Sequence, residues 1–266
     1  MKTHQSGDLP APEAARLLHD LTGRVALVTG GASGLGRAIA WGFACHGADV
    51  AIADRNLQGA QAAASEIAEG TGRRSLALAV DVAQEAQVDE AVARTIQELG
   101  GLDILLNGAG SNLRKPLLEF SQDEFDSILQ VHVRGTFLFC RAAGKHMMKQ
   151  GRGSIINIAS IAAHVGIANV APYAAAKGGI LQLSRSLALE LARHGVRVNV
   201  VSPGFVETPM TLQHAPEVRS RIAEATPVGR FGQASELIGP TVFLASDASS
   251  FVTGSALAVD GGWTTQ

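Results

Sequence analysis

The sequence predicts an α/β fold, in which a doubly wound sheet of seven parallel strands carries helices on both faces. Short runs rich in Val, Ile, Leu and Ala alternate along the chain with longer segments of helical periodicity. Most of the short runs are apolar without a break, which is typical of strands buried on both faces of a parallel sheet. Strand–helix alternation repeated this often favours right-handed crossovers between parallel strands.

The predicted strands cover residues 24–29, 49–53, 75–81, 103–107, 153–159, 196–202 and 256–260. The predicted helices fill most of the chain between them, at residues 36–46, 57–69, 85–99, 121–149, 173–194 and 235–246. No linker and no internal repeat divides residues 21–266, so we expect one domain preceded by a flexible arm at residues 1–20. Residues 204–230 are too long for a simple connection and are expected to form a lid over a binding site.

The composition is that of an ordinary globular protein, with 46% hydrophobic residues, 17% charged residues and a net charge of −2. The absence of a Lys/Arg block argues against binding to nucleic acid or to an anionic membrane. No apolar run reaches the roughly 18 residues of a membrane span, and residues 1–20 lack the apolar centre of a signal peptide. We therefore expect a cytoplasmic protein, with Cys45 and Cys140 as buried thiols and no metal site.

The glycine-rich segment TGGASGLG at residues 29–36 directly follows the first predicted strand and opens a helix. Glycines let the backbone approach a pyrophosphate, and a helix N-terminus offers free N–H groups. Ligands of such sheets bind beyond the carboxyl ends of the strands, where this segment lies. A tight turn without a ligand is the alternative. We expect this segment to bind a dinucleotide through Gly30, Ser33, Gly34, Leu35 and Gly36.

Asp54 directly follows the second predicted strand. A carboxylate there can accept hydrogen bonds from the ribose hydroxyls of an adenosine and repels a 2′-phosphate, which favours NAD over NADP. Asp54 could instead cap the next helix, and the neighbouring guanidinium of Arg55 could serve a phosphate.

Small or polar residues also follow the third and fourth predicted strands, as Asp81-Val82 and as NGAG at residues 107–110. Small side chains let a flat adenosine and ribose lie close to the edge of the sheet. Together with the glycine-rich segment they predict a cofactor lying across the strand ends, with contacts to Asp81, Val82, Asn107, Ala109 and Gly110.

The single tyrosine of the chain, Tyr173, stands four residues before Lys177 in a predicted helix. Positions i and i+4 share a helix face, so the phenol and the ammonium can point at one site. A free tyrosine has a pKa of about 10, and a neighbouring cation is expected to lower this pKa toward the working range of a general acid or base. Ser160, at the end of the fifth strand, can orient a substrate oxygen.

These motifs in this order resemble the short-chain dehydrogenase/reductase family, a variant of the Rossmann fold, over residues 21–266. The resemblance rests on TGGASGLG at 29–36, NGAG at 107–110, Ser160 with YAAAK at 173–177, and Pro203-Gly204. It implies an NAD-dependent oxidoreductase that transfers hydride to or from a secondary alcohol or ketone. In that family the tyrosine is the acid/base, the lysine lowers its pKa and binds the nicotinamide ribose, and the serine holds the substrate carbonyl.

The resemblance also implies nicotinamide contacts from Pro203, Gly204, Val206 and Thr208, besides those of Tyr173 and Lys177. The lack of a basic residue at position 33 agrees with Asp54 in favouring NAD. Family members are commonly homotetramers, and the matching surfaces here are the predicted helices 121–149 and 173–194 and the region 251–262.

His132 is a departure from the family pattern, which has an asparagine in the helix after the fourth strand. That asparagine kinks the helix and helps to hold a water that relays protons from the lysine. An imidazole can also donate and accept protons, so His132 is a candidate catalytic residue with a different pH response. The alternative is that it is a tolerated substitute without a catalytic role.

The predicted substrate is a small hydroxylated or anionic molecule, because the loops after the fourth and fifth strands carry Asn112, Arg114, His164 and Asn169. This loop chemistry and the segment before the first strand are similar to those of gluconate 5-dehydrogenases and related sugar-acid and polyol dehydrogenases. Arg114 could equally be a solvated surface residue. A 3-oxoacyl-thioester reductase uses the same active residues and is the main alternative. A non-catalytic NAD sensor is the remote one, since such proteins typically lack the tyrosine or the lysine.

Overall fold

The computed structural model describes residues 17–209, 211–213 and 215–266. Most of the expected N-terminal arm, residues 1–16, lies outside the described residues, as do Met210 and His214 within the expected lid.

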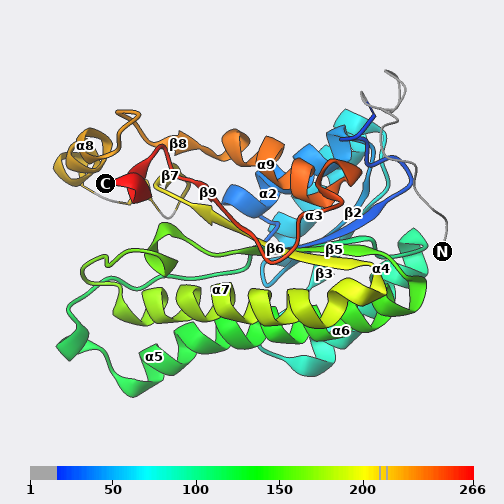
Figure 1. Cartoon of the computed structure of the whole chain (residues 1–266), viewed down its shortest axis with the longest axis horizontal. Coiled ribbons are helices and arrows are strands. Elements are labelled where there is room, and N and C mark those ends of the chain that lie inside the picture. The colour runs from blue at the N-terminus through cyan, green and yellow to red at the C-terminus, as the bar shows by residue number, and fades with distance from the viewer. Residues whose placement is uncertain (1–16, 210, 214) are drawn as a thin grey trace, which may run out of the picture.

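Seven parallel strands form one sheet, as the sequence predicts, in the order β3-β2-β1-β4-β5-β6-β9 (Figure 1). Each matches its predicted run to within two residues at either end. The strands are β1 (Val25–Thr29), β2 (Asp49–Asp54), β3 (Ser75–Ala79), β4 (Ile104–Asn107), β5 (Gly153–Ile158), β6 (Val196–Pro203) and β9 (Ala256–Val259). The strand order reverses direction between β1 and β4, and this is where ligands of doubly wound sheets bind.

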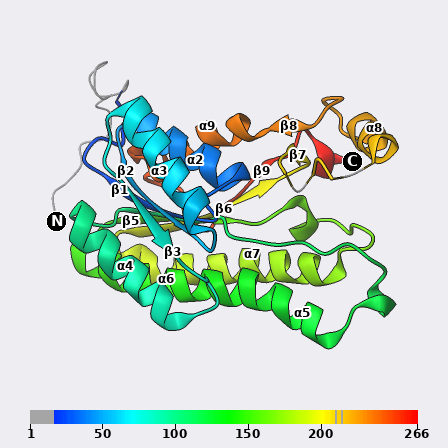
Figure 2. The ribbon, with the colours of Figure 1, turned by 180° about the vertical axis from the view of Figure 1, so that it is seen from behind.

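Helices cover both faces of this sheet (Figure 2). The α-helices of the described residues are α2 (Gly34–Cys45), α3 (Leu57–Thr71), α4 (Glu85–Leu99), α5 (Gln122–Leu129), α6 (Gly135–Gln150), α7 (Ala171–Leu191), α8 (Pro216–Ala225) and α9 (Ile238–Ala245). One layer contains α2, α3 and α9, and the other contains α4, α6 and α7.

Alternate residues of each central strand serve these two layers, which explains the unbroken apolar runs of the sequence. In β1, Ala26 and Val28 pack into the core under α2, α3 and α9. Their neighbours Val25 and Leu27 pack into the core over α4, α6 and α7. All four side chains are buried. A strand of this kind cannot alternate polar and apolar residues, because neither of its faces meets water.

The predicted helix 121–149 is interrupted. It comprises α5, a π-helical segment at Gln130–Arg134 and α6. A capping box between Ser121 and Glu124 begins α5, and Gly151 in a left-handed conformation follows α6. A π turn inserts an extra residue into the helical repeat and is frequent at functional sites. Here it holds His132, the residue at which the sequence departs from the family pattern.

The expected lid region contains one α-helix in the described residues, α8, and the short strand β7 (Val206–Glu207). β7 pairs with β8 (Gly232–Gln233) in a small parallel sheet of its own. Pro216 stands in the first turn of α8, where its missing N–H has no helical partner to lose.

Of the two free cysteines, Cys140 is buried as expected, but Cys45 is exposed. The expectation for Cys45 was wrong because it stands at the last position of α2, on the side that faces solvent. No helix in the described part of the chain is both long and apolar enough to cross a membrane. Within the same ranges, no three His, Cys, Asp or Glu side chains are grouped as a metal site requires.

Candidate active site

A cavity of about 750 Å³ lies at the carboxyl ends of the strands and extends to the lid region. Every residue that the sequence singled out for cofactor binding or catalysis lines it, with Asn107 as the exception. The cavity therefore brings together segments that are up to 183 positions apart in the chain, from Gly30 to Gln213.

The floor of one end is made of glycines whose backbones are in van der Waals contact. A Cβ on Gly30 would lie 2.8 Å from the backbone nitrogen of Ala109, and a Cβ on Gly36 would collide with the carbonyl of Gly30. Gly30 also has a φ of 68°, which side chains rarely tolerate. Ser33 directly precedes α2, so free N–H groups of the first helical turn face this floor. The cradle fits a pyrophosphate, which backbone N–H groups bind well.

Asp54 is held rigidly at the same end. Its Oδ2 accepts a hydrogen bond from the backbone N–H of Ala32 at 3.1 Å, and its Oδ1 accepts one from Asn56 at 2.9 Å. The alternative of a helix cap is not realised, because Asn56 caps α3 through the N–H of Gly59. Both Asp54 and Arg55 line the cavity, so either could meet an adenosine ribose.

Asn107 does not reach the cavity, although the sequence placed it among the cofactor contacts. Its side chain is buried and donates a hydrogen bond to Asn157 Oδ1 at 2.8 Å. Asn157 in turn donates to Ser184 Oγ on α7 at 2.8 Å. This buried chain of hydrogen bonds ties β4 and β5 to the helix that carries Tyr173 and Lys177.

Lys177 and Tyr173 lie on one face of α7, as their spacing predicts. The Lys177 ammonium is 5.4 Å from the centroid of the Tyr173 ring, and it donates a hydrogen bond to the carbonyl of Ile158 at 2.7 Å. Burial lowers the pKa of Lys177 to about 7. Ser160, at the end of β5, lines the same cavity, and its hydroxyl accepts a hydrogen bond from Ala162 N–H at 3.2 Å.

The pKa of Tyr173 is shifted in the direction opposite to the one expected from the sequence. Burial raises the pKa of Tyr173 above its usual value, and the nearby hydroxyl of Ser160 opposes this only in part. In the protein without cofactor, burial sets the direction of this shift, because desolvation disfavours the charged forms of both groups. The lowering of this pKa by Lys177 stays a prediction. At neutral pH the phenol is therefore protonated and can act as a proton donor.

His132 is 1% exposed, and its ring packs edge-on against that of Tyr173, with 5.3 Å between centroids. Its Nε2 lies 2.7 Å from the carbonyl oxygen of Ser111 and 3.2 Å from the N–H of the same residue. The shorter contact assigns the proton to Nε2, which leaves Nδ1 as an acceptor. This Nδ1 is buried without a hydrogen-bond partner among the described residues.

The surroundings of His132 also fix its charge and orientation. A Cβ on Gly110 would lie 2.5 Å from the imidazole Cε1, so the ring depends on a glycine at that position. Burial, with a smaller contribution from the charge of Lys177, lowers the pKa of His132 to about 3. The imidazole is therefore neutral throughout the physiological pH range.

Three of the polar residues that the sequence associated with substrate do not line the cavity. Arg114 is exposed. His164 forms a hydrogen bond with Ser202 Oγ at 2.9 Å. Asn169 has a φ of 65°, and its carbonyl accepts a hydrogen bond from Lys115 N–H. The two loops that hold these residues are thus joined to each other.

Ser127 and Gln213 line the cavity although sequence reasoning did not single them out. Ser127 lies inside α5, where a serine is unremarkable by sequence. Gln213 belongs to the expected lid, and its position in that segment was the only available signal.

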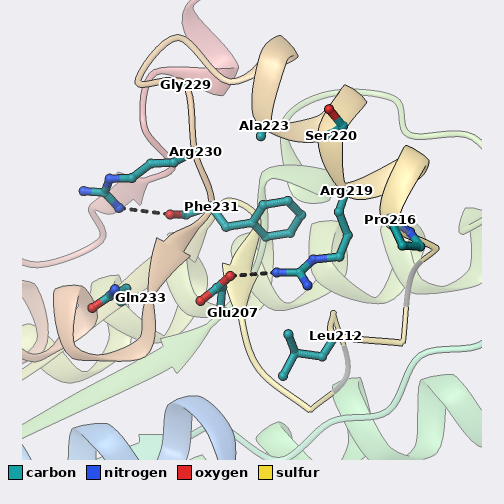
Figure 3. A pocket seen from close by; sticks show the side chains of 10 residues that line it. All are labelled: Glu207, Leu212, Pro216, Arg219, Ser220, Ala223, Gly229, Arg230, Phe231 and Gln233. Atoms are coloured by element: carbon teal, nitrogen blue, oxygen red, sulfur yellow. Dashed lines mark hydrogen bonds and ion pairs between the residues drawn. The ribbon is translucent and has the colours of Figure 1, made fainter.

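A second cavity of about 650 Å³ lies against α8 and the segment that follows it (Figure 3). Arg219 lines this cavity and forms an ion pair with Glu207 at 2.7 Å. Its guanidinium lies 5.5 Å from the centroid of the Phe231 ring. These contacts fasten α8 to β7, whose next residue in the chain is Thr208 of the main cavity.

Comparison with known proteins agrees with this arrangement. The family model described as "Enoyl-(Acyl carrier protein) reductase" matches residues 30–264. The chain is 39% identical to gluconate 5-dehydrogenase of Gluconobacter oxydans, over 93% of this chain and 97% of that protein. It is 41% identical to D-threitol dehydrogenase of Mycolicibacterium smegmatis, over 92% and 94%. The crystal structure of a gluconate 5-dehydrogenase from Burkholderia cenocepacia, in complex with NADP and tartrate, superposes with a TM-score of 0.91 at 37% identity, covering 95% of this chain and 99% of that one.

Proposed function

The chain belongs to the short-chain dehydrogenase/reductase family, and on that premise we propose that it oxidises a small polyhydroxylated alcohol, or reduces the corresponding ketone, with NAD as cofactor. The observation that carries the proposal is a single cavity. It has a glycine cradle and Asp54 at one end, and Ser160, Tyr173 and Lys177 at the other. The names of the relatives, a sugar-acid dehydrogenase and a polyol dehydrogenase, support the same substrate class.

We propose that Gly30, Ser33, Gly34, Leu35 and Gly36 hold the pyrophosphate of the cofactor, and that Asp54 holds the adenosine ribose. Asp81, Val82, Ala109 and Gly110 border the adenosine half. Pro203, Gly204, Val206 and Thr208 border the nicotinamide half. When bound, the nicotinamide supplies hydride to the substrate carbon or accepts it. Asn107 acts only indirectly, through Asn157 and the anchoring of α7.

The proton is moved by the side chains on α7. In reduction, Tyr173 Oη donates its proton to the carbonyl oxygen while Ser160 Oγ holds that oxygen in place. The resulting phenolate is stabilised by the ammonium of Lys177, which then returns a proton to it and is itself reprotonated from solvent. In oxidation the same groups run in reverse, with the phenolate accepting the hydroxyl proton. Hydrogen bonding of Lys177 to Ile158 keeps the ammonium beside the phenol throughout.

We propose that His132 contributes by position and as a neutral acceptor. Its Nε2–H holds the backbone of Ser111, and its free Nδ1 can accept a hydrogen bond from a water or from the Lys177 ammonium. A pKa of about 3 excludes an imidazolium as a proton donor at neutral pH.

A preference for NAD follows from the fixed carboxylate of Asp54, which would lie against a 2′-phosphate. The Burkholderia relative was crystallised with NADP, so this preference needs a direct test. We expect the ratio of kcat/KM for NAD to that for NADP to fall at least tenfold in Asp54→Ala. Arg55→Ala should raise the ratio if it changes it at all. An unchanged ratio in Asp54→Ala would contradict the ribose role.

The substrate class is tested by following NADH absorbance with polyols, sugar acids, simple secondary alcohols and a 3-ketoacyl thioester. We expect turnover of at least one polyhydroxylated substrate, with little activity on the thioester. The reverse result would favour the 3-oxoacyl-thioester reductase. Tight NADH binding without turnover of any class would favour a sensor.

We also propose a homotetramer, because large apolar side chains are exposed on α5, α6 and α7 and near the C-terminus. They are Phe125, Phe137, Met148, Leu189 and Phe251. Exposed apolar surface of this kind marks interfaces. Light scattering coupled to size-exclusion chromatography should give four times the chain mass of 27.5 kDa.

A further inference from the structure

We propose that the substrate is an uncharged polyol, or its ketone, and that its hydroxyls are recognised by neutral amides and hydroxyls, so that the enzyme discriminates against sugar acids. This inference rests on the proposed function, which does not distinguish between polyols and sugar acids as substrates. What carries it is the distribution of charge along the lining of the main cavity.

Five neutral hydrogen-bonding residues line the cavity without a role in the proposed cofactor contacts, and we assign them to the substrate. Ser111 and Asn112 follow β4, and β4 is the neighbour of β5, after which Ser160 lies. Thr211 and Gln213 come from the lid region, and Ser127 comes from α5. Amides and hydroxyls both donate and accept, so they can pair with the alternating donors and acceptors of a polyol chain.

Positive charge is confined to two of the described lining residues, and neither is placed for a substrate carboxylate. Arg55 follows β2, which is three strands away from β5 in the sheet, or about 14 Å at the usual strand spacing. Lys177 is 5% exposed, and its ammonium is engaged with the carbonyl of Ile158 beside Tyr173. The proposed proton transfer uses this ammonium, so it is not available to bind a substrate carboxylate.

The cations of the loop after β4 are also not available inside the cavity. Lys115 pairs with both carboxylate oxygens of Glu124, at 2.6 and 2.7 Å, and lies over the ring of Phe120 at 5.1 Å. Arg114 is exposed and outside the lining. The basic residues that suggested an anionic substrate from sequence are therefore solvated or neutralised.

The chemical consequence is a difference in desolvation. A carboxylate taken from water into a site without a cation loses hydration that neutral donors replace only in part. A hydroxyl group exchanges its water contacts for amide and hydroxyl contacts at little net loss. Sites that pair with substrate hydroxyls can also discriminate strongly against analogues that lack the matching group.

The test compares substrates that differ only in the charged group, namely D-threitol with D-threonate and D-glucitol with D-gluconate. We expect kcat/KM for the polyol to exceed that for the acid at least tenfold in whichever pair is turned over. An equal or greater value for the acid overturns this inference but leaves the proposed function intact. Turnover of the 3-ketoacyl thioester alone would overturn both.

Variants of the lining residues test which side chains cause the preference for the polyol over the acid. Gln213→Ala and Asn112→Ala should each raise KM for the polyol at least threefold, with a smaller change in kcat, whereas the exposed α3 variant Gln58→Ala should change neither. Gln213→Arg should shift the polyol-to-acid ratio at least tenfold toward the acid. No shift in the arginine variant would overturn the assignment of this end of the cavity to the substrate.

Two further variants test the basic residues that are nearest in the sequence to Gln213 and Asn112. His214 lies outside the described residues, and Arg114 is exposed. We expect His214→Gln and Arg114→Gln to leave the polyol-to-acid ratio within twofold of the wild-type value. A selective loss of acid turnover in either variant would show that a cation serves the substrate and would overturn the inference.

Discussion

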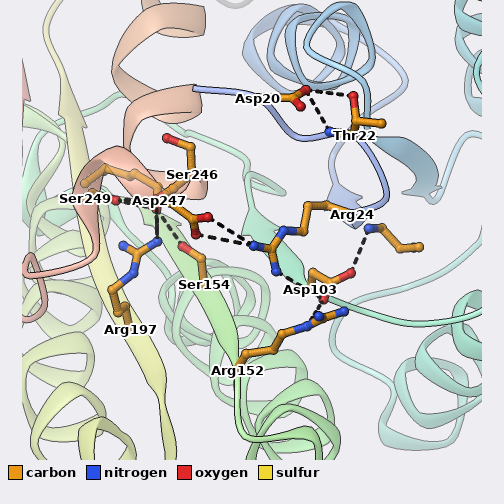
Figure 4. Close-up of polar contacts among 12 residues, drawn as sticks. Asp20, Thr22, Arg24, Asp103, Arg152, Ser154, Arg197, Ser246, Asp247 and Ser249 are labelled. Atoms are coloured by element: carbon orange, nitrogen blue, oxygen red, sulfur yellow. Dashed lines mark hydrogen bonds and ion pairs between the residues drawn. The ribbon is translucent and has the colours of Figure 1, made fainter. Parts of the chain in front are cut away.

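The two ends of the central sheet differ in whether their charged side chains have ion-pair partners. At the amino ends of β1, β4, β5 and β6, charged side chains are paired with one another (Figure 4). Asp103 accepts hydrogen bonds from the N–H of Val25 at 3.0 Å and from Arg152 Nε at 2.9 Å. Arg24 reaches both Asp103, at 3.9 Å, and Asp247, at 3.3 Å.

Backbone carbonyls complete this network. Arg197 donates to the carbonyls of Leu244 at 2.8 Å and Ser246 at 3.2 Å, and Ser154 Oγ donates to Leu244 at 2.7 Å. The network joins the start of the strands to the segment after α9. Its charges are satisfied, as buried polar groups in stable regions normally are.

At the carboxyl ends, three titratable groups lie close together without an ion-pair partner among the described residues. Lys177 and His132 are buried and hydrogen-bond to backbone atoms, and Tyr173 is partly buried. Burial lowers the pKa of Lys177 to about 7 and of His132 to about 3, and it raises the pKa of Tyr173. Groups with shifted pKa values concentrate at functional sites, where reactivity is kept at the expense of stability. In this protein the stabilising ion pairs and the reactive groups therefore lie at opposite ends of the same strands.

The largest expected effect is on the reactive end. Tyr173→Phe should lower kcat about 10²- to 10⁴-fold, because it removes the phenol that donates the proton in the proposed mechanism. Cofactor binding, measured by NADH fluorescence, and the melting temperature should stay close to the wild-type values. A variant that retains most of its turnover would show that the proton moves through another group.

The matching change at the stabilising end is Asp103→Ala. It leaves the Val25 N–H buried without an acceptor and removes the partner of Arg152, so unfolding in urea should show a loss of about 2–4 kcal/mol. The kcat of the folded variant should be unchanged within twofold. Glu69→Ala, which removes an exposed carboxylate from α3, is the control and should change stability by less than about 0.5 kcal/mol. Equal effects of the two variants would contradict the stabilising role of the network.

Lys177→Met should raise the stability of the fold, in contrast to the loss expected for Asp103→Ala. The depressed pKa of Lys177 means that the unfolded chain binds the proton more tightly, so stability falls as pH decreases from about 10.5 to 7. Replacing the ammonium with an apolar side chain of similar length should raise stability by about 1–3 kcal/mol at pH 7, while turnover falls sharply. A loss of stability at pH 7 would remove the contrast between the two ends.

The smallest expected effect belongs to His132→Asn and depends on pH. Because the pKa of His132 is about 3 in the folded state and about 6.5 when unfolded, the wild type loses stability as pH falls from 6.5 toward 3. The variant should equal the wild type at pH 7, apart from changes in packing, and should gain up to about 2 kcal/mol relative to it at pH 5. Urea unfolding at the two pH values measures this difference, and parallel pH profiles would contradict a buried neutral imidazole.

The pH dependence of kcat provides a separate check on His132. An ionisation that disappears from the profile between pH 5 and 8 in His132→Asn would show that the imidazole titrates during turnover. We expect no such change, and we expect kcat of the asparagine variant to stay within tenfold of the wild-type value.

The sequence by itself determined the sheet and the ligand end. Short apolar runs located all seven strands. The inner strands are buried on both faces because the helices cover both sides of the sheet, whereas the edge strands β3 and β9 are only partly buried. The glycine-rich segment 29–36 and the spacing of Tyr173 and Lys177 are local patterns, so their geometry follows from backbone freedom and helical periodicity.

Tertiary structure alone decided what depends on neighbours distant in the chain. Asn107 does not reach the cavity because its side chain donates a hydrogen bond to Asn157, which in turn donates one to Ser184. The orientation of the His132 ring depends on its contact with the backbone of Ser111, and the direction of the Tyr173 pKa shift depends on desolvation of the phenol. Desolvation and long-range pairing are properties of the packed chain, and no local pattern in the sequence contains them.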